Sequence, residues 1–391
     1  MVLWLAAGPR PDEHAPAESV PPLDAAEGFT LGNPGPWGQM EYRVIRVELP
    51  DENIAIDQPG QAPVRWFFSG HDKSQAIEFL RSAGLGQAQL ERLQGADWKT
   101  EANGVAVEPG DELVLSLGPE SRAKIYALLV EMPENEGSVD PLWFRPGQVD
   151  QRLKDSGLAQ SSLDLLERLL YAQGKDLLLF ADFGPAARNL PDAAERRRFV
   201  KAVCRKKTLL ARLRIGPESD VADMVAYWSV GGRRKDVAPL LNAVKREGEG
   251  TLSILSLLPR FIRERLYTYP VLSSGPAAPK QDGLWSAMNA FRESPDDRFA
   301  DRSHLKQVLQ QDHYNILAPS QLGDLVFLST QQDTVVHAAV YIADDVMFTK
   351  NGVGPTQPWL LMHLQDLIDT HAVRYPSKGP LKTLYFRPKA G

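Results

Sequence analysis

The chain has 391 residues, a length that predicts two to four domains. Hydrophobic residues make up 43% of it and charged residues 24%, which is typical of a soluble globular protein. The net charge of −6 provides no overall positive field, so nucleic acid is not expected as a partner. The single cysteine, Cys204, excludes an intramolecular disulfide and a cysteine-rich zinc site. No apolar run reaches the roughly 20 residues of a transmembrane helix, so no membrane span is expected.

Residues 1–40 are predicted to be a flexible leader. Residues 9–40 are rich in Pro, Gly, Ala and acidic residues and show little periodicity. The apolar start, residues 1–8, fits the tail of a trimmed export signal, although it lacks a basic region and is short for a signal. A chance apolar start fits equally well, so an exported, periplasmic location and a cytoplasmic one both stay open.

Residues 41–147 are predicted to form a small α+β domain, because strand-like and helix-like patterns alternate in it. The turn Glu108-Pro-Gly-Asp separates two apolar runs, and this arrangement predicts a β-hairpin across residues 105–117. Further elements are expected as strands at residues 42–47 and 64–68, a helix over 73–94 that breaks near Gly84, and a helix or strand over 121–132.

The middle domain, residues 148–265, is predicted to be helical, because its apolar residues recur with a helical period. Gly and Pro residues separate the periodic segments. No repeat length emerges, which argues against a solenoid. Helices are expected over residues 161–170, 191–207, 219–228, 235–246 and 252–266.

Residues 266–391 are predicted to be a third domain, in which a histidine lies on a strand. Residues 323–327 (GDLVF) predict one strand, and residues 335–342 (VVHAAVYI) predict a second, with His337 near its start. Residues 346–352 are expected to return as an antiparallel neighbour of that strand. A helix over residues 359–370 and a last strand over 381–387 are also expected.

A helix start upstream of these strands has the features of a nucleophile position. Asp282 fits the N-cap of a helix that begins at Gly283. Cysteine hydrolases place their cysteine at such a helix start, because the helix dipole and a nearby imidazole favour the thiolate. A third polar group then fixes the tautomer of the imidazole. The position that this chemistry needs is therefore present, but glycine occupies it.

These segments resemble the NlpC-type family of cell-wall peptidases and amidases, which have a papain-like α+β fold. In that family a Tyr precedes an Asp-Cys pair at a helix start; a Gly-Asp-Leu-Val-Phe strand, a His-(small)-(small)-Val/Ile-Tyr-Ile strand and a third polar residue follow. The resemblance implies that His337 is the base and that Asn351 or Lys350 orients it. It also implies that Tyr269 lies near the nucleophile position, where Gly283 replaces the cysteine. The Trp-Gly-Gly that usually follows the Tyr is absent.

The resemblance covers residues 266–391 and leads to three hypotheses. The first is a catalytically inactive, NlpC-like bacterial protein that binds a peptide or amide ligand such as cell-wall peptide. The second is a non-enzymatic structural or adaptor protein whose function lies in residues 41–265. The third is an active hydrolase with another nucleophile; Ser286 lies one helical turn beyond the favoured position, and Cys204 has no base nearby in the sequence.

No cofactor or metal is expected, because the spacing of His304 and His313 matches no metal-binding signature. The oligomeric state stays open. The hydrolase-like hypotheses require that Gly283 and His337 meet in space. We expect the Gly283 Cα within roughly 5–7 Å of a His337 ring nitrogen, the distance that a thiol side chain and a hydrogen bond would fill.

Overall fold

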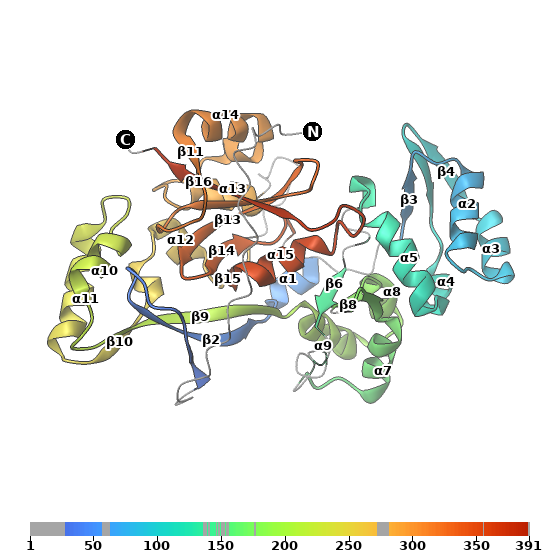
Figure 1. Cartoon of the computed structure of the whole chain (residues 1–391). Coiled ribbons are helices and arrows are strands. Elements are labelled where there is room, and N and C mark those ends of the chain that lie inside the picture. Colours follow the sequence, from blue (N-terminus) through green and yellow to red (C-terminus); the bar gives the residue numbers. More distant parts are fainter. Residues whose placement is uncertain are drawn as a thin grey trace. The chain divides into compact units, whose positions relative to one another are not determined.

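The structure is a computed structural model in which the chain forms a mixed α+β protein with antiparallel sheets, in agreement with the predicted class (Figure 1). Two compact units divide the chain. The first unit combines residues 1–47, 206–369 and 380–391, and the second combines residues 48–205 and 370–379. The structure describes residues 28–56, 63–135, 139, 141–145, 147, 149, 153, 156–175, 177–271, 281–354 and 356–389.

The two units do not follow the predicted domain boundaries at residues 147 and 265. The reason is a long-range pairing in the first unit, where strand β2 (Gln39–Val47) pairs along its whole length with strand β9 (Lys206–Ile215). Local patterns do not show such pairing. The predicted leader is also wrong for residues 28–40, because β1 (Thr30–Leu31) pairs with β2. Residues 1–27, including the apolar start, lie outside the described residues.

A six-stranded antiparallel sheet in the first unit carries the predicted histidine strand (Figure 1). Strands β13 (Val335–Ala343) and β14 (Val346–Lys350) are joined by a tight turn. Asp344 in this turn has a φ of 57°, a left-handed conformation that Asp tolerates in hairpins. The strand order is β11-β16-β12-β13-β14-β15. The strands span β11 (His313–Ile316), β12 (Leu325–Ser329), β13 (Val335–Ala343), β14 (Val346–Lys350), β15 (Trp359–His363) and β16 (Lys382–Pro388).

The helix predicted over residues 359–370 is wrong in its first part. Residues 359–363 form β15, which pairs with β14, and α15 (Leu364–Ala372) begins only after it. The run Trp-Leu-Leu-Met is short and continuously apolar, and such a run fits a buried strand and a buried helix equally well. Four of the five β15 residues are buried, which explains why the run lacks alternation.

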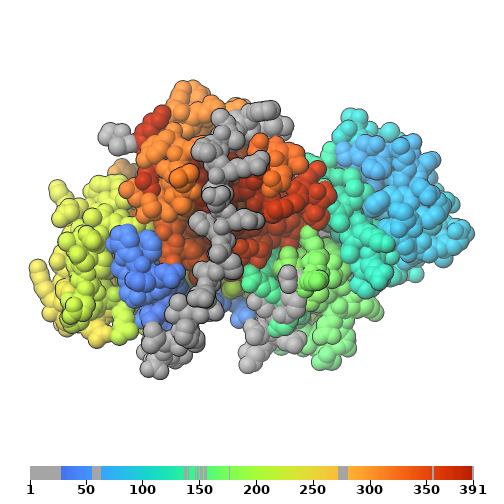
Figure 2. Space-filling view, in the orientation of Figure 1, coloured from blue at the N-terminus to red at the C-terminus, as the bar shows by residue number. Residues whose placement is uncertain are grey.

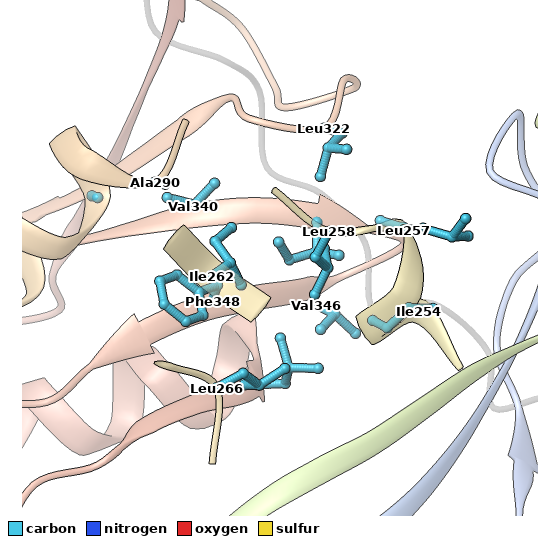
Figure 3. Packing of buried hydrophobic residues seen from close by; sticks show 14 of the residues in the cluster. Ile254, Leu257, Leu258, Ile262, Leu266, Ala290, Leu322, Val340, Val346 and Phe348 are labelled. Atoms are coloured by element: carbon cyan, nitrogen blue, oxygen red, sulfur yellow. The ribbon is translucent and has the colours of Figure 1, made fainter. Parts of the chain in front are cut away.

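Short helices cover the sheet of the first unit and form its hydrophobic core. Figure 3 shows Ile262 next to Phe348 and Ile254 next to Val346, both of these partners in the sheet. Burial of aliphatic side chains of this size stabilises a fold by about 1.5–3 kcal/mol each. The helices of this layer are η3 (Ile254–Leu257), α12 (Arg260–Arg265), α13 (Gly283–Asn289), η4 (Asp297–Ala300) and α14 (Arg302–Asp312).

A second sheet in the first unit shows that the predicted helical middle is only partly helical. Strands β9 and β10 (Gly250–Ser253) pair with each other, in the order β1-β2-β9-β10. The alternating Thr-Leu-Leu-Ala-Arg-Leu-Arg-Ile run of β9 is typical of a strand. The Thr208 hydroxyl accepts from the backbone N–H of Leu361 at 3.0 Å, which links β9 to β15. Helices α10 (Val221–Trp228) and α11 (Arg234–Arg246) were predicted.

The second unit contains two three-stranded sheets, and its α2 to α4 region forms one continuous light-blue and cyan lobe in Figure 2. The predicted hairpin across residues 105–117 is wrong: β5 pairs with β3 and β4, and the second apolar run forms α4. Asp111 and Glu112 lie in the first turn of α4, where acidic side chains favour a helix. The elements are α1 (Asp51–Ile56), β3 (Trp66–Ser69), α2 (Lys73–Ser82), α3 (Gln87–Gln94), β4 (Trp98–Glu101), β5 (Gly104–Val107), α4 (Asp111–Ser116), α5 (Pro119–Leu129), η2 (Pro133–Asn135), β6 (Leu142–Phe144), α7 (Gln160–Leu169), β7 (Tyr171–Gln173), β8 (Leu177–Phe180), α8 (Phe183–Arg188) and α9 (Ala193–Cys204).

Candidate functional site

Helix α13 begins where the sequence predicts it, with Gly283 as its first residue and Asp282 as its N-cap. One carboxylate oxygen of Asp282 accepts from the backbone N–H of Trp285 at 2.9 Å, which satisfies one of the unpaired donors of the first turn. The other oxygen forms an ion pair with Arg302 at the start of α14. These two interactions cap α13 and join its tip to the start of α14.

The structure brings Gly283 and His337 into direct contact. A Cβ placed on Gly283 would lie 2.6 Å from His337 Nδ1 and 2.8 Å from the carbonyl oxygen of Ala338, and closer still to His337 Cε1. A Cα–Cβ bond spans about 1.5 Å, so the Gly283 Cα lies within about 4.1 Å of Nδ1. The two residues meet as predicted, but this distance is shorter than the expected 5–7 Å and leaves no room for a thiol and a hydrogen bond between them. The imidazole therefore occupies the space that any side chain at position 283 would need.

The other ring nitrogen of His337 has a threonine as its partner. Nε2 lies 2.7 Å from the Thr349 hydroxyl, and that hydroxyl donates its one proton to Asn351 Oδ1 at 3.0 Å. Thr349 must then accept from Nε2–H, which assigns the neutral tautomer with a lone pair on Nδ1. The unprotonated nitrogen is therefore the one that faces position 283.

Asn351 thus lies behind Thr349 rather than directly against the imidazole. Residues two apart on a strand share a face, which is why Thr349 and Asn351 line up in this relay. Thr349 was not predicted, because the register between β13 and β14 decides which residue of β14 meets the imidazole. The Asn351 amide also lies 3.1 Å from the sulfur of Met362 on β15.

Lys350 does not orient the imidazole; this alternative is wrong because Lys350 points to the opposite face of β14. Its side chain is 0% exposed and lies with its Nζ 5.5 Å from the centre of the Trp359 ring. Nζ donates to the carbonyl oxygens of Gly352 at 2.6 Å and Gly354 at 3.4 Å. Burial lowers the pKa of Lys350 to about 7, against the opposing effect of Asp282.

Tyr269 lies in the first unit, and its hydroxyl donates to the carbonyl oxygen of Val47 at the end of β2, at 3.3 Å. The structure thus gives Tyr269 a backbone partner. The two alternative nucleophiles are both buried. The hydroxyl of Ser286 accepts from the indole N–H of Trp359 at 2.9 Å, and Cys204 ends α9 in the second unit.

The imidazole of His337 is 2% exposed, and this burial governs its protonation. Burial, with a smaller contribution from the charge of Arg302, lowers the pKa of His337 to about 3. The ring is therefore neutral at physiological pH, as a base must be before it takes a proton. A substrate carbonyl has no access to the ring while the side chains keep these positions.

Acid should destabilise the first unit through His337. An unfolded His binds a proton near pH 6.5, whereas the folded one resists protonation down to about pH 3, so stability falls as the pH drops through this window. At pH 4 this loss reaches up to about 3 kcal/mol. His337→Gln cannot titrate, so urea unfolding at pH 7 and pH 4 should show a smaller acid loss for the variant. If wild type and His337→Gln lose the same free energy of unfolding between pH 7 and pH 4, the imidazole is not buried as a neutral ring.

Among the described residues, no group of three or more His, Cys, Asp or Glu side chains is arranged to hold a metal ion. No helix in the same part of the chain is long and apolar enough to cross a membrane. Comparison with known proteins gives no match, since no family model fits the chain and no curated protein or solved structure is significantly similar to it.

Proposed function

We propose that residues 266–391 provide a cysteine-hydrolase-like scaffold of the NlpC type that works without catalysis. The contact between the His337 imidazole and the first residue of α13 supports this proposal most directly. The imidazole, its Thr349–Asn351 relay and the start of α13 lie together, and a thiol at position 283 would fit beside the ring only after the ring moves. Only the nucleophile is missing, since Gly283 has no side chain.

The chemistry of the restored site follows from this geometry. A thiolate at position 283 would sit at the N-terminal end of α13, and His337 Nδ1 would take its proton. Attack on an amide carbonyl would form the acyl-enzyme, with the ring returning the proton to the leaving amine. The glycine removes the first of these steps, so the expected role is to bind a peptide or amide ligand, with cell-wall peptide as the candidate, and to leave it intact.

An exposed group at the helix tip is one that a ligand would meet. Arg302 keeps 38% of its side chain exposed while it pairs with Asp282 at the N-cap of α13. An exposed guanidinium at this place suits the carbonyl oxygens of a peptide or amide ligand.

A Gly283→Cys variant tests the scaffold directly. If His337 acts as a base toward position 283, the new thiol should react with iodoacetamide at pH 7 faster than the same thiol in Gly283→Cys/His337→Ala. The measurement is the labelling rate by intact mass, on a Cys204→Ser background so that one thiol is present. A thiol paired with imidazole has a lowered pKa, so about tenfold faster labelling is expected. Equal rates in both backgrounds would remove the proposal.

The alternative of a non-catalytic adaptor with its function in residues 41–265 has its own structural support. The second unit contains a cavity of about 840 Å³. Its walls come from residues in α4, α7 and α8 and in the connection between α4 and α5. We rank an active hydrolase with another nucleophile last, because Ser286 and Cys204 are both buried. Wild-type protein should therefore leave peptide substrates uncleaved.

A further inference from the structure

The cavity in the second unit is built from one compact part of the chain. Its walls come from α4, from the connection between α4 and α5, from α7 and from the end of α8, and its volume is about 840 Å³. This size lies within the usual range for small-molecule sites, roughly 300–1,000 Å³. The cavity therefore has room for a small organic ligand.

The charges that line the cavity leave one cation without a partner. Asp111 receives two hydrogen bonds from Arg188, both at 2.6 Å, so this pair is neutral as a whole. Glu112 pairs with Arg92 at 2.7 Å. Arg168 on α7 also lines the cavity, and within the described part of the chain it forms no ion pair or hydrogen bond.

Leu115, Leu117 and Pro119 form an apolar part of the wall, next to Ser116, Gly118 and Asn189. Leu115 is half-buried and packs against the core that α7, α8 and α9 share, and Leu117 is buried at the end of α4. An apolar wall beside one unpaired guanidinium favours a ligand that combines an acidic group with an apolar part, because Arg binds carboxylate and phosphate oxygens through two parallel hydrogen bonds.

We propose that this cavity binds a small anionic ligand, a carboxylate or a phosphate attached to an apolar group, with Arg168 as its anion contact. The proposal goes beyond the hydrolase-like scaffold and does not depend on it, because every residue that carries it belongs to the second unit. Arg188 has a different role, in which its ion pair with Asp111 joins α8 to α4 and keeps the wall of the cavity in place.

Ligand-observed NMR titrations of the full chain test the proposal with three probes. N-acetyl-leucine carries a carboxylate and an apolar side chain, N-acetyl-leucinamide is its uncharged analogue, and inorganic phosphate carries the anion alone. Saturation transfer follows the two organic probes, and phosphate is followed by ³¹P line width and by competition with N-acetyl-leucine. Binding of N-acetyl-leucine or of phosphate is expected, with the amide at least about tenfold weaker than the acid, as loss of a charge-assisted hydrogen bond implies.

Variants identify the contact. Arg168→Gln should weaken anion binding about tenfold or more, whereas Lys124→Gln, an equal loss of charge at an exposed position of α5 outside the cavity, should not change it. Leu115→Ala should weaken N-acetyl-leucine and leave phosphate unchanged. A response to phosphate alone assigns a phosphate ligand, and a response to N-acetyl-leucine alone assigns a carboxylate. Three results would overturn the proposal. They are equal binding of N-acetyl-leucine and N-acetyl-leucinamide, no binding of either N-acetyl-leucine or phosphate, and equal anion affinities of Arg168→Gln and wild type.

Discussion

Replacing Gly283 by alanine should destabilise the first unit by roughly 2–4 kcal/mol, a large effect for one added methyl group. Intrinsic helix propensity acts in the opposite direction, because Ala is favoured over Gly by up to about 1 kcal/mol within a helix. The steric effect dominates, since the new Cβ would lie 2.6 Å from His337 Nδ1 and 2.8 Å from a backbone oxygen. Urea unfolding of variant and wild type measures the difference.

Removing the imidazole should reduce this effect strongly. His337→Ala leaves a cavity of its own and should cost about 2–4 kcal/mol, but it removes the two closest contacts of alanine at 283 and leaves only the carbonyl oxygen of Ala338 near it. In that background Gly283→Ala should cost clearly less than in wild type, which gives a coupling energy of about 2 kcal/mol. Gly216→Ala is the matched control, because a Cβ there meets nothing within 4 Å. A stabilising Gly283→Ala in wild type would mean that the ring is free to leave position 283.

The size of this coupling shows whether position 283 can hold a side chain beside the imidazole. If the ring yields at low cost, a cysteine at 283 would have the space that it needs. If the ring resists, Thr349 and Asn351 hold the imidazole against Gly283. The second outcome favours a structural role for the imidazole, since a buried histidine with satisfied hydrogen bonds stabilises a core without any catalysis.

The sequence predicts the local features of this site well. The N-cap at Asp282, the strands on either side of residue 334 and the turn at Asp344 follow from capping preference, alternation and turn chemistry, which all act over a few residues. The proximity of His337 to Gly283 came instead from a family resemblance, and no periodicity could have supplied it.

The errors concern features that local patterns do not encode. Thr349 was missed because a strand position becomes a partner only once the neighbouring strand and its register are known. The pairing of β2 with β9 joins Val47 to Lys206 and Gln39 to Arg214, residues more than 150 positions apart, and no local pattern indicates it. The prediction of a helix at β15 is wrong because both faces of this strand are covered, which removes the alternation that identifies a strand.

The second large effect is expected at Lys350. This residue is fully buried, and no carboxylate among the described residues forms a hydrogen bond with its ammonium group. Lys350→Met should raise the free energy of unfolding by roughly 2 kcal/mol at pH 6, because it removes the cost of burying a charge and loses only bonds to two carbonyl groups. The folded pKa of about 7 lies below the unfolded value of 10.5. Between those two pH values the unfolded chain binds a proton that the folded chain does not, so wild-type stability rises with pH.

The advantage of Lys350→Met should therefore shrink as the pH rises from 6 to 10 and vanish or reverse at the upper end, where the neutral amine keeps its bonds to Gly352 and Gly354. Urea unfolding at pH 6, 8 and 10 follows this trend. Lys235→Met, at an exposed position of α11, should change stability by less than about 0.5 kcal/mol at every pH. A pH-independent gain for Lys350→Met would show that the amine stays protonated in the fold, held by the carbonyl oxygens and the Trp359 ring strongly enough to offset its burial.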